Sequence, residues 1–294
     1  MEDHFKYCAA LVREADRDRY LATLFAPADE RGALFALYAF NAEISRVRTL
    51  AREPMPAEIR LQWWHEVILG ERAGEAAANP VAAALLATLS RHGLPAEELT
   101  GLIEARRFDV YDDPIVSLAE LQSYAAKSAA TIFELAAHIL TGGLTSGIKG
   151  VAAEAGQAQT IADMLALLPQ HAARHQLYVP LDLLRHYRAE ADDVFAMRAT
   201  PEVRAVLAEL RLRGRRHLTQ VALSELAEKA KPAFLSLAPL WQWLLDMERP
   251  DYDPFRPLQA ALWRRQWRIW RAAKSRGLTG LMRRHRKREI DSGQ

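Results

Sequence analysis

Apolar positions recur every three to four residues along most of the chain, the period of an amphipathic α-helix. No segment keeps the alternation of apolar and polar residues that is typical of a half-buried strand. The pattern therefore predicts an all-α fold. We expect its helices over these segments: 3–24, 26–51, 55–72, 79–93, 95–111, 117–143, 145–175, 200–230, 232–247 and 256–274.

Local signals indicate where several of these helices begin and end. Pro27 lies near the expected start of the second helix, and Gly93 is typical of a C-terminal stop. Ser117 followed by Glu120 is a capping-box pattern. The small residues of 71–80 are expected to form a connector. The seventh helix is expected to be interrupted or to end near Pro169.

Length and composition predict a single large helical domain over residues 1–275, followed by a basic tail at 276–294. Half of the residues are hydrophobic, which is enough for a sizeable core. The net charge of +2 gives no reason to expect a nucleic-acid partner. No apolar run is long enough to span a membrane, and the charged first twenty residues do not resemble a signal peptide.

Cysteine usage fits a reducing compartment, because the single Cys8 rules out a disulfide within the chain. A reactive thiol at this position is less favoured than a small buried hydrophobic residue. We therefore expect a cytoplasmic location.

Two stretches carry a specific resemblance. "LFAPADERGALFALYAFNAEISRV" at 24–47 resembles the first signature of the squalene/phytoene synthase family, and "EAGQAQTIADMLALLPQHAARHQLYVPLDLL" at 154–184 resembles the second. The segment 111–140 resembles the middle helix of that family, and order and spacing match over about residues 5–230. The resemblance implies the isoprenoid synthase fold.

The family's reaction joins two prenyl diphosphates, and it needs Mg²⁺ held by carboxylates on facing helices. Carboxylates four residues apart lie on one helical face. At the corresponding positions this sequence carries Ser45, Arg46 and Thr49 in the first signature, and Leu167 and His171 in the second. Asp163 stands where the family has asparagine. The substitutions predict that metal-dependent ionisation is lost, so no metal or other cofactor is expected.

One branch of the family, the mitochondrial complex I assembly factor 6 and its bacterial relatives, is known for this loss. "AFNAEISRVR", "QLYVPLDLL" and the "RLQWWHEVI" segment at 60–68 are similar to that branch. The resemblance implies a role in assembling NADH dehydrogenase, with complex I subunits as partners. Two alternatives stay open: an active Mg²⁺-dependent squalene or phytoene synthase, and a lipid-binding module unconnected with complex I.

The resemblance also implies a cavity that could hold a prenyl or lipid ligand. Arg31 and Tyr38 match positions at its diphosphate end, and Tyr124 matches a tyrosine beside the reaction centre. The full set of predicted ligand-binding residues is Arg31, Tyr38, Asn41, Tyr124, Asp163 and Tyr178. Ordinary helix packing is the alternative for Arg31 and Tyr38, and fixing the turn after the second signature is the alternative for Tyr178.

Two further pairs of polar residues could form a metal site or an acid–base site, but we favour a structural role for each pair. His171 and His175 have a spacing that can bind zinc on a helix, but no third ligand is evident, and a solvent-facing polar turn is the simpler interpretation. Asp112 and Asp113 are adjacent acids before a proline, and we expect a solvated turn there instead of an acid–base site.

The segment "ALWRRQWRIWRAAKSRG" at 261–277 combines aromatic and basic residues. Its tryptophans share one helical face, and arginines occupy much of the rest. Such a helix could bind a membrane surface through Trp263, Trp267, Trp270, Arg264, Arg268 and Arg271. A core helix that uses tryptophan as filler is the alternative, and RNA binding is a weaker third option. We expect a location at the inner face of the cytoplasmic membrane.

Overall fold

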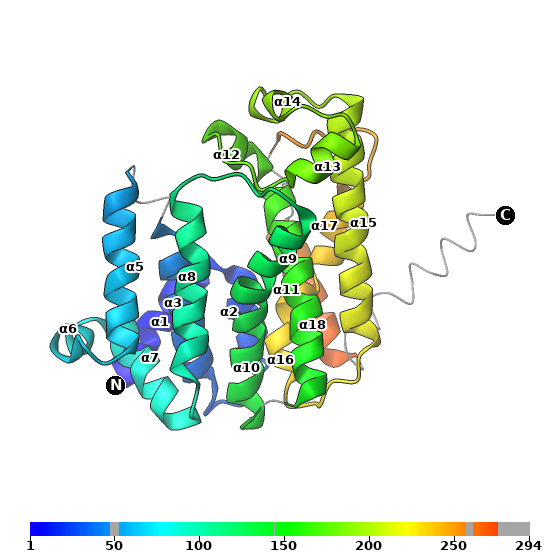
Figure 1. The fold of residues 1–294 in the computed structure, drawn as a ribbon. Coiled ribbons are helices and arrows are strands. Elements are labelled where there is room, and N and C mark those ends of the chain that lie inside the picture. The colour runs from blue at the N-terminus through cyan, green and yellow to red at the C-terminus, as the bar shows by residue number, and fades with distance from the viewer. Residues whose placement is uncertain (48–52, 144, 257–260, 276–294) are drawn as a thin grey trace. The chain divides into compact units, whose positions relative to one another are not determined.

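The structure is a computed structural model, and it describes residues 1–47, 53–143, 145–256 and 261–275 (Figure 1). Within these ranges the regular elements are helices and there is no strand, which confirms the all-α prediction. The described chain forms two compact units, and each is considered by itself. The predicted basic tail at 276–294 lies outside the described residues.

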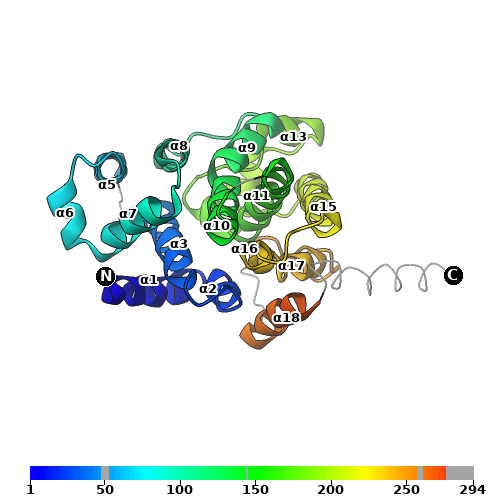
Figure 2. The ribbon, with the colours of Figure 1, turned by 90° about the horizontal axis from the view of Figure 1, so that it is seen from below.

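The first unit comprises Met1–Tyr111, Thr131–Ala152 and Glu225–Ser236. Its helices are α1 (Glu2–Ala15), α2 (Arg17–Thr23), α3 (Arg31–Ser45), α5 (Pro54–Ile68), α6 (Ala73–Ala78), α7 (Pro80–His92), α8 (Ala96–Arg107), α10 (Thr131–Thr141) and α16 (Lys231–Phe234), with a 3₁₀ turn at Phe108–Val110. Helix α3 is the core of this unit. It packs against α1, α2, α7, α8 and α10, and Figure 2 shows it beside α1 and α7.

The burial of α3 follows from its sequence, in which apolar residues occupy nearly every side. Eleven of its fifteen residues are buried, among them Leu37 and Phe40. A helix that is apolar all round is stable only when other helices surround it. Any functional side chain on α3 is therefore held rigidly by the core.

The second unit comprises Asp112–Ala130, Ala153–Ser224 and Leu237–Gln294. Its helices are α9 (Leu118–Ala125), α12 (Leu168–Ala173), α13 (Leu181–His186), α14 (Ala191–Phe195), α15 (Pro201–Leu223), α17 (Leu240–Asp246) and α18 (Leu262–Lys274), with a π-helical turn at Ala126–Ala130. Helix α11 (Ser146–Ala166) begins in the first unit and ends in the second, and the 3₁₀ turn Leu235–Leu237 also falls at a boundary.

Some helix boundaries differ from the sequence prediction for identifiable reasons. The first expected helix is divided at Asp16, whose side chain accepts a hydrogen bond from Arg19 N at 3.0 Å and so starts α2. The second starts at Arg31 instead of near Pro27, and the expected connector at 71–80 contains the short helix α6. The chain after Pro180 forms α13 and α14, which the periodicity did not indicate.

The long helix expected at 117–143 is interrupted at the π-helical turn between α9 and α10. Its predicted start is correct, because Ser117 accepts a hydrogen bond from Glu120 N at 3.2 Å. A Cβ added at Gly156 would lie 2.5 Å from Ala130 N. Helix α11 therefore approaches the π turn so closely that only glycine fits at position 156. Among the described helices, none is both long enough and apolar enough to cross a bilayer.

Candidate functional site

Helix α3 carries the first-signature positions, and two polar atoms on it lack partners. Asn41 is 8% exposed, and its Oδ1 has no hydrogen-bond partner in the described part of the chain. Ser45 Oγ, one helical turn further on, is also buried and unpartnered. A buried polar atom without a partner costs roughly 1–3 kcal/mol, so this face would gain from a bound donor. Arg46 is exposed at the end of α3, and Thr49 lies outside the described residues.

Arg31 and Tyr38 sit on the same helix in different surroundings. Arg31 Nε donates to the Ala26 carbonyl at 2.9 Å, which closes the turn before α3. Tyr38 is buried, and burial raises the pKa of its hydroxyl well above the ordinary value. The Arg19 guanidinium lies 5.4 Å from the Tyr38 ring centre and 5.7 Å from that of Phe133. Both predicted residues thus have packing partners within the first unit.

In the second unit the structure brings Tyr124 and Tyr178 together, with ring centres 6.3 Å apart. The His171 ring packs on Tyr178 at 4.5 Å. Burial, with a smaller contribution from nearby Arg174, lowers the pKa of His171 to about 4, so the imidazole is neutral at physiological pH. The family's second acid position therefore holds an uncharged ring against a tyrosine.

Asp163 is the remaining acid of the second signature. It is exposed on α11, and its Oδ1 accepts a hydrogen bond from Gln159 Nε2 at 2.8 Å. Leu167, one turn further on, follows at the end of the helix and is exposed. Among the described residues, no group of three or more His, Cys, Asp or Glu side chains is arranged to hold a metal ion.

The histidine pair and the adjacent acids both lie in turns. Helix α12 ends at Ala173, and His175 has a left-handed φ of 56° and packs on Phe195 at 5.1 Å, so His171 and His175 do not share a helical face. Asp112 also has a left-handed φ and accepts a hydrogen bond from Gln176. These contacts give the pairs structural roles in the turns.

The "RLQWWHEVI" segment forms most of α5, and its two tryptophans lie edge-on with ring centres 5.0 Å apart but differ in burial. Trp64 is 1% exposed and packs edge-on against Phe40 of α3, with ring centres 5.0 Å apart. The Trp63 indole Nε1 donates to Glu75 Oε2 of α6 at 2.7 Å. Arg60 pairs with Glu43 of α3 at 2.6 Å. The motif therefore ties α5 to α3 and α6.

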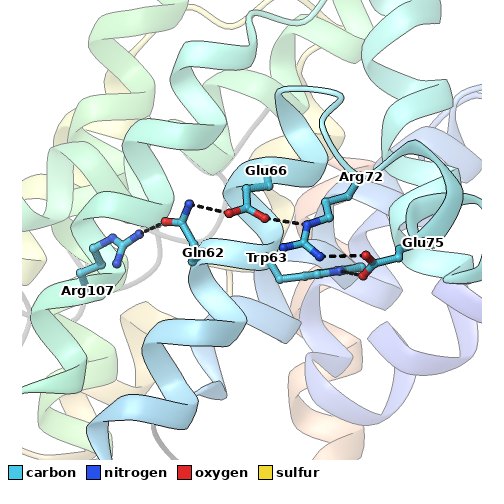
Figure 3. Close-up of polar contacts among 6 residues, drawn as sticks. All are labelled: Gln62, Trp63, Glu66, Arg72, Glu75 and Arg107. Atoms are coloured by element: carbon cyan, nitrogen blue, oxygen red, sulfur yellow. Dashed lines mark hydrogen bonds and ion pairs between the residues drawn. The ribbon is translucent and has the colours of Figure 1, made fainter.

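Charged and amide side chains continue from Trp63 as a connected network (Figure 3). Arg72 binds Glu66 at 2.7 Å and Glu75 at 2.8 Å, and Gln62 Nε2 donates to Glu66 at 2.9 Å. Arg107 of α8 donates to Gln62 Oε1 at 2.9 Å. These hydrogen bonds lower the pKa of Glu66 and of Glu75, so both carboxylates stay anionic near neutral pH.

The network borders a cleft of about 400 Å³ in the first unit, lined by Glu58, Ile59, Gln62, Trp63, Glu66, Arg72 and Arg107. The tryptophan motif is typical of one branch of the family, but its sequence did not predict a cleft. Arg72 and Arg107 pair with acids up to 49 residues away. These pairs depend on the tertiary structure, so the sequence pattern could not predict them.

Helix α18 turns its tryptophans outward. Trp263, Trp267 and Trp270 are 64%, 52% and 45% exposed, whereas Ile269 and Ala272 are buried. The Trp267 and Trp270 rings stack with centres 5.1 Å apart. These exposures argue against tryptophan as core filler. The sequence had left that alternative open.

The arginines of α18 lie beside its tryptophans, and they differ in how exposed they are. Arg264 lies over the Trp263 ring at 5.3 Å on the exposed side. Arg265 lies over Trp243 at 4.7 Å, and burial lowers the pKa of the half-buried Arg268. Arg268 was predicted to bind a membrane, and the structure places it partly inside the unit. Arg264 is exposed, and Arg271 is half-buried like Arg268.

Comparison with known proteins places these features in a family. The squalene/phytoene synthase profile matches residues 12–271. Human "NADH dehydrogenase (ubiquinone) complex I, assembly factor 6" is 29% identical over 262 residues, covering 87% of this chain and 76% of the human protein. Phytoene synthase from Thermus thermophilus is 30% identical over 215 residues, covering 71% of each chain.

Solved structures agree at the level of the fold. A dehydrosqualene synthase in complex with ligand superposes with a TM-score of 0.79 at 16% identity, covering 93% of this chain and 96% of the other. Squalene synthase HpnC from Alicyclobacillus acidocaldarius gives 0.72 at 23% identity, covering 87% and 96%. These neighbours confirm the predicted isoprenoid synthase fold. The chain belongs to the squalene/phytoene synthase family.

Proposed function

We propose that this chain is a non-catalytic member of its family that acts at a membrane surface in the assembly of respiratory complex I. The observation that carries the proposal is the loss of acids at the family's metal-binding positions. Those positions hold Ser45, Arg46, Leu167 and His171 in the described chain.

Electrostatics explains why these replacements disfavour magnesium. The ion prefers oxygen ligands and needs several of them in near-octahedral geometry. Arg46 would repel a divalent cation, and a leucine offers no ligand atom. His171 is neutral, but its ring is packed on Tyr178, and nitrogen is a poor ligand for magnesium. Asp163 would be a single carboxylate with part of its capacity taken by Gln159.

The link to complex I is supported by the relatives. Proteins named complex I assembly factor 6 from human and rat align with this chain over 87% of its length. Phytoene synthase from Thermus thermophilus aligns at similar identity over a shorter stretch, which keeps an active synthase as the second candidate.

An activity assay separates the two candidates. Purified protein is incubated with radiolabelled farnesyl or geranylgeranyl diphosphate, Mg²⁺ and NADPH, with Thermus phytoene synthase as the positive control. We expect no squalene or phytoene from this chain. Turnover into either product above the buffer blank would contradict the non-catalytic proposal.

A genetic experiment tests the assembly role. The gene is deleted in its host, and NADH dehydrogenase activity is measured in isolated membranes. We expect that activity to fall and to recover when the wild-type gene is restored. Unchanged activity would favour a lipid-binding module with no connection to complex I.

Membrane association is supported by the outward tryptophans of α18. Tryptophan rings favour the headgroup level of a bilayer, and each basic residue near an anionic surface contributes about 1 kcal/mol. The helix contains no acidic residue that would oppose this attraction. We therefore place the protein peripherally at the inner face of the cytoplasmic membrane. Flotation with anionic vesicles tests this, and protein that stays at the bottom of the gradient would contradict it.

A prenyl or lipid ligand is the final part of the proposal. Its support is the unpartnered pair on α3, Asn41 and Ser45. Native mass spectrometry of the purified protein, followed by lipid extraction, would detect a bound molecule. Asn41→Leu should reduce its occupancy, because the variant removes the polar acceptor while keeping similar volume.

A further inference from the structure

The α5–α6–α8 cleft has an ordered polar lining. Arg72 is held between Glu66 and Glu75, and Arg107 donates to Gln62 (Figure 3). Arg107 is also paired with Glu58. Side chains that are already fixed lose little conformational entropy when a ligand arrives. A carboxylate can accept about four hydrogen bonds, so the paired acids keep acceptor capacity for an incoming donor. The lining is therefore prepared for a cationic group.

Apolar side chains lie exposed beside the polar lining. Met55 is 72% exposed and Ile59 is 64% exposed, and the two are one turn apart on α5. Tyr111 is 56% exposed, and its hydroxyl bonds to Glu58, which also lines the cleft. Methionine, tyrosine, tryptophan and arginine are the residues enriched in the buried centres of protein interfaces. This composition favours a protein partner over a small polar ligand.

The sign of the charge around the cleft limits the kind of partner. Residues 53–79 contain five acids and two arginines, and with Arg107 of the cleft lining the net charge is −2 (3 − 5). Glu71, one of the five acids, is exposed next to Arg72. An anionic lipid surface would be repelled here, whereas lysine or arginine side chains would be attracted.

We propose that the cleft between α5, α6 and α8 docks a basic amphipathic helix of a protein partner. The apolar face of that helix lies on Ile59 and Trp63, and its cationic edge meets Glu66 and Glu71. An amphipathic helix in a groove buries apolar anchors at three- and four-residue spacing, which suits a cleft bordered by an apolar strip and an acidic rim. The inference concerns the first unit and does not depend on the proposed function.

The experiment uses the full-length protein and two fluorescent peptides measured by anisotropy. One is a model helix with leucines on one face and lysines on the other, and its counterpart carries glutamates in place of the lysines. We expect the basic peptide to bind and the acidic peptide to bind at least about tenfold more weakly, because the segment around the cleft has a net negative charge. Equal binding of the two peptides would overturn the proposal.

Variants localise the binding to the cleft. Ile59→Ser and Glu71→Lys change exposed side chains, and each should weaken binding of the basic peptide about fivefold or more. Leu212→Ser and Glu202→Lys on α15 make the same chemical changes at exposed positions of the second unit and should leave the affinity unchanged. Circular dichroism melting curves check that all four variants fold.

Three outcomes would overturn the assignment of the partner. Unchanged affinity in Ile59→Ser and Glu71→Lys would show that the peptide binds elsewhere. Binding to anionic vesicles that Ile59→Ser abolishes would identify a lipid surface as the occupant. A concentration-dependent dimer, seen by sedimentation velocity and lost in Ile59→Ser, would identify a second copy of the chain.

Discussion

Helices α5 and α18 both carry neighbouring tryptophans, but these side chains have different surroundings. In α5 the Trp64 ring is buried against Phe40, and the Trp63 indole donates to Glu75. In α18 three tryptophans are about half exposed, and the described contacts of Trp267 are with its neighbour Trp270. A tryptophan thus has a structural role where helices of the same unit cover it, and it is available to another surface where they do not.

The charges of the two helices follow the same division. Arg60 of α5 pairs with Glu43 of α3, and Glu66 of α5 pairs with Arg72, so these charges are satisfied within the unit. Helix α18 contains four arginines and one lysine and no acid. The two helices share tryptophan, and both their charge and the elements around them separate them.

The largest effect is expected from removing the buried tryptophan. Trp64→Ala should lower the free energy of unfolding by about 3–5 kcal/mol, because a large side chain leaves a cavity in the core. Trp267→Ala on α18 should change it by less than about 0.5 kcal/mol, because the ring is exposed. Urea denaturation followed by circular dichroism measures both. Similar losses of unfolding free energy in the two variants would contradict the different roles given to the tryptophans of α5 and α18.

A smaller effect is expected on membrane binding. The double variant Arg264→Gln with Arg271→Gln should weaken binding to anionic vesicles by about 2 kcal/mol, roughly thirtyfold, because each basic residue contributes about 1 kcal/mol. The matched control is Arg13→Gln with Arg17→Gln, which removes the same charge from exposed positions of the first unit. Vesicle co-sedimentation at several lipid concentrations gives the affinities. Equal weakening by both pairs would mean that net charge, not α18, sets the binding.

Trp63→Phe should have a modest effect, because it removes one hydrogen bond and keeps a smaller aromatic ring. We expect a loss of about 0.5–1.5 kcal/mol in the free energy of unfolding, since the bond is partly solvated. Trp263→Phe on α18 is the matched control and should have no measurable effect. A loss in the control as large as in Trp63→Phe would contradict the structural role assigned to α5.

The smallest expected effect is a pH dependence of the α5 network. Hydrogen bonds from Arg72 and Trp63 lower the pKa of Glu75 below its ordinary value of 4.5. The stabilisation is therefore complete above that ordinary value and is lost as the pH falls through the lowered pKa. A carboxyl NMR titration should show the Glu75 pKa moving back toward 4.5 in Trp63→Phe. An unmoved pKa would show that the indole bond does not act on this carboxylate.

Much of the fold could be predicted because helices leave a local signal. The Ser117 cap, the Gly93 stop and the break near Pro169 depend on neighbouring residues, and the structure confirms all three. The division at Asp16 and the π turn at Ala126–Ala130 were missed. The first depends on a side chain that caps a new helix, and the second accompanies the close approach of Gly156, which is a contact distant in sequence.

The candidate sites divide in the same way. The tryptophan face of α18 could be predicted from spacing alone, since all its members lie on one helix. The α5 cleft could not, because Arg107 and Glu75 reach it from separate helices. The low pKa of His171 was also beyond the sequence, because burial causes it, whereas the favoured interpretation of the sequence was a solvent-facing polar turn.

Main-chain hydrogen bonds join the turn before α9 to the chain after α12. Ile115 N donates to Leu177 O at 3.1 Å, Leu181 N donates to Ile115 O at 3.0 Å, and Asp182 N donates to Val116 O at 3.2 Å. Bonds between peptide groups do not depend on which side chains the residues carry. Side chains in this stretch can therefore be exchanged during evolution while these connections of the scaffold are kept.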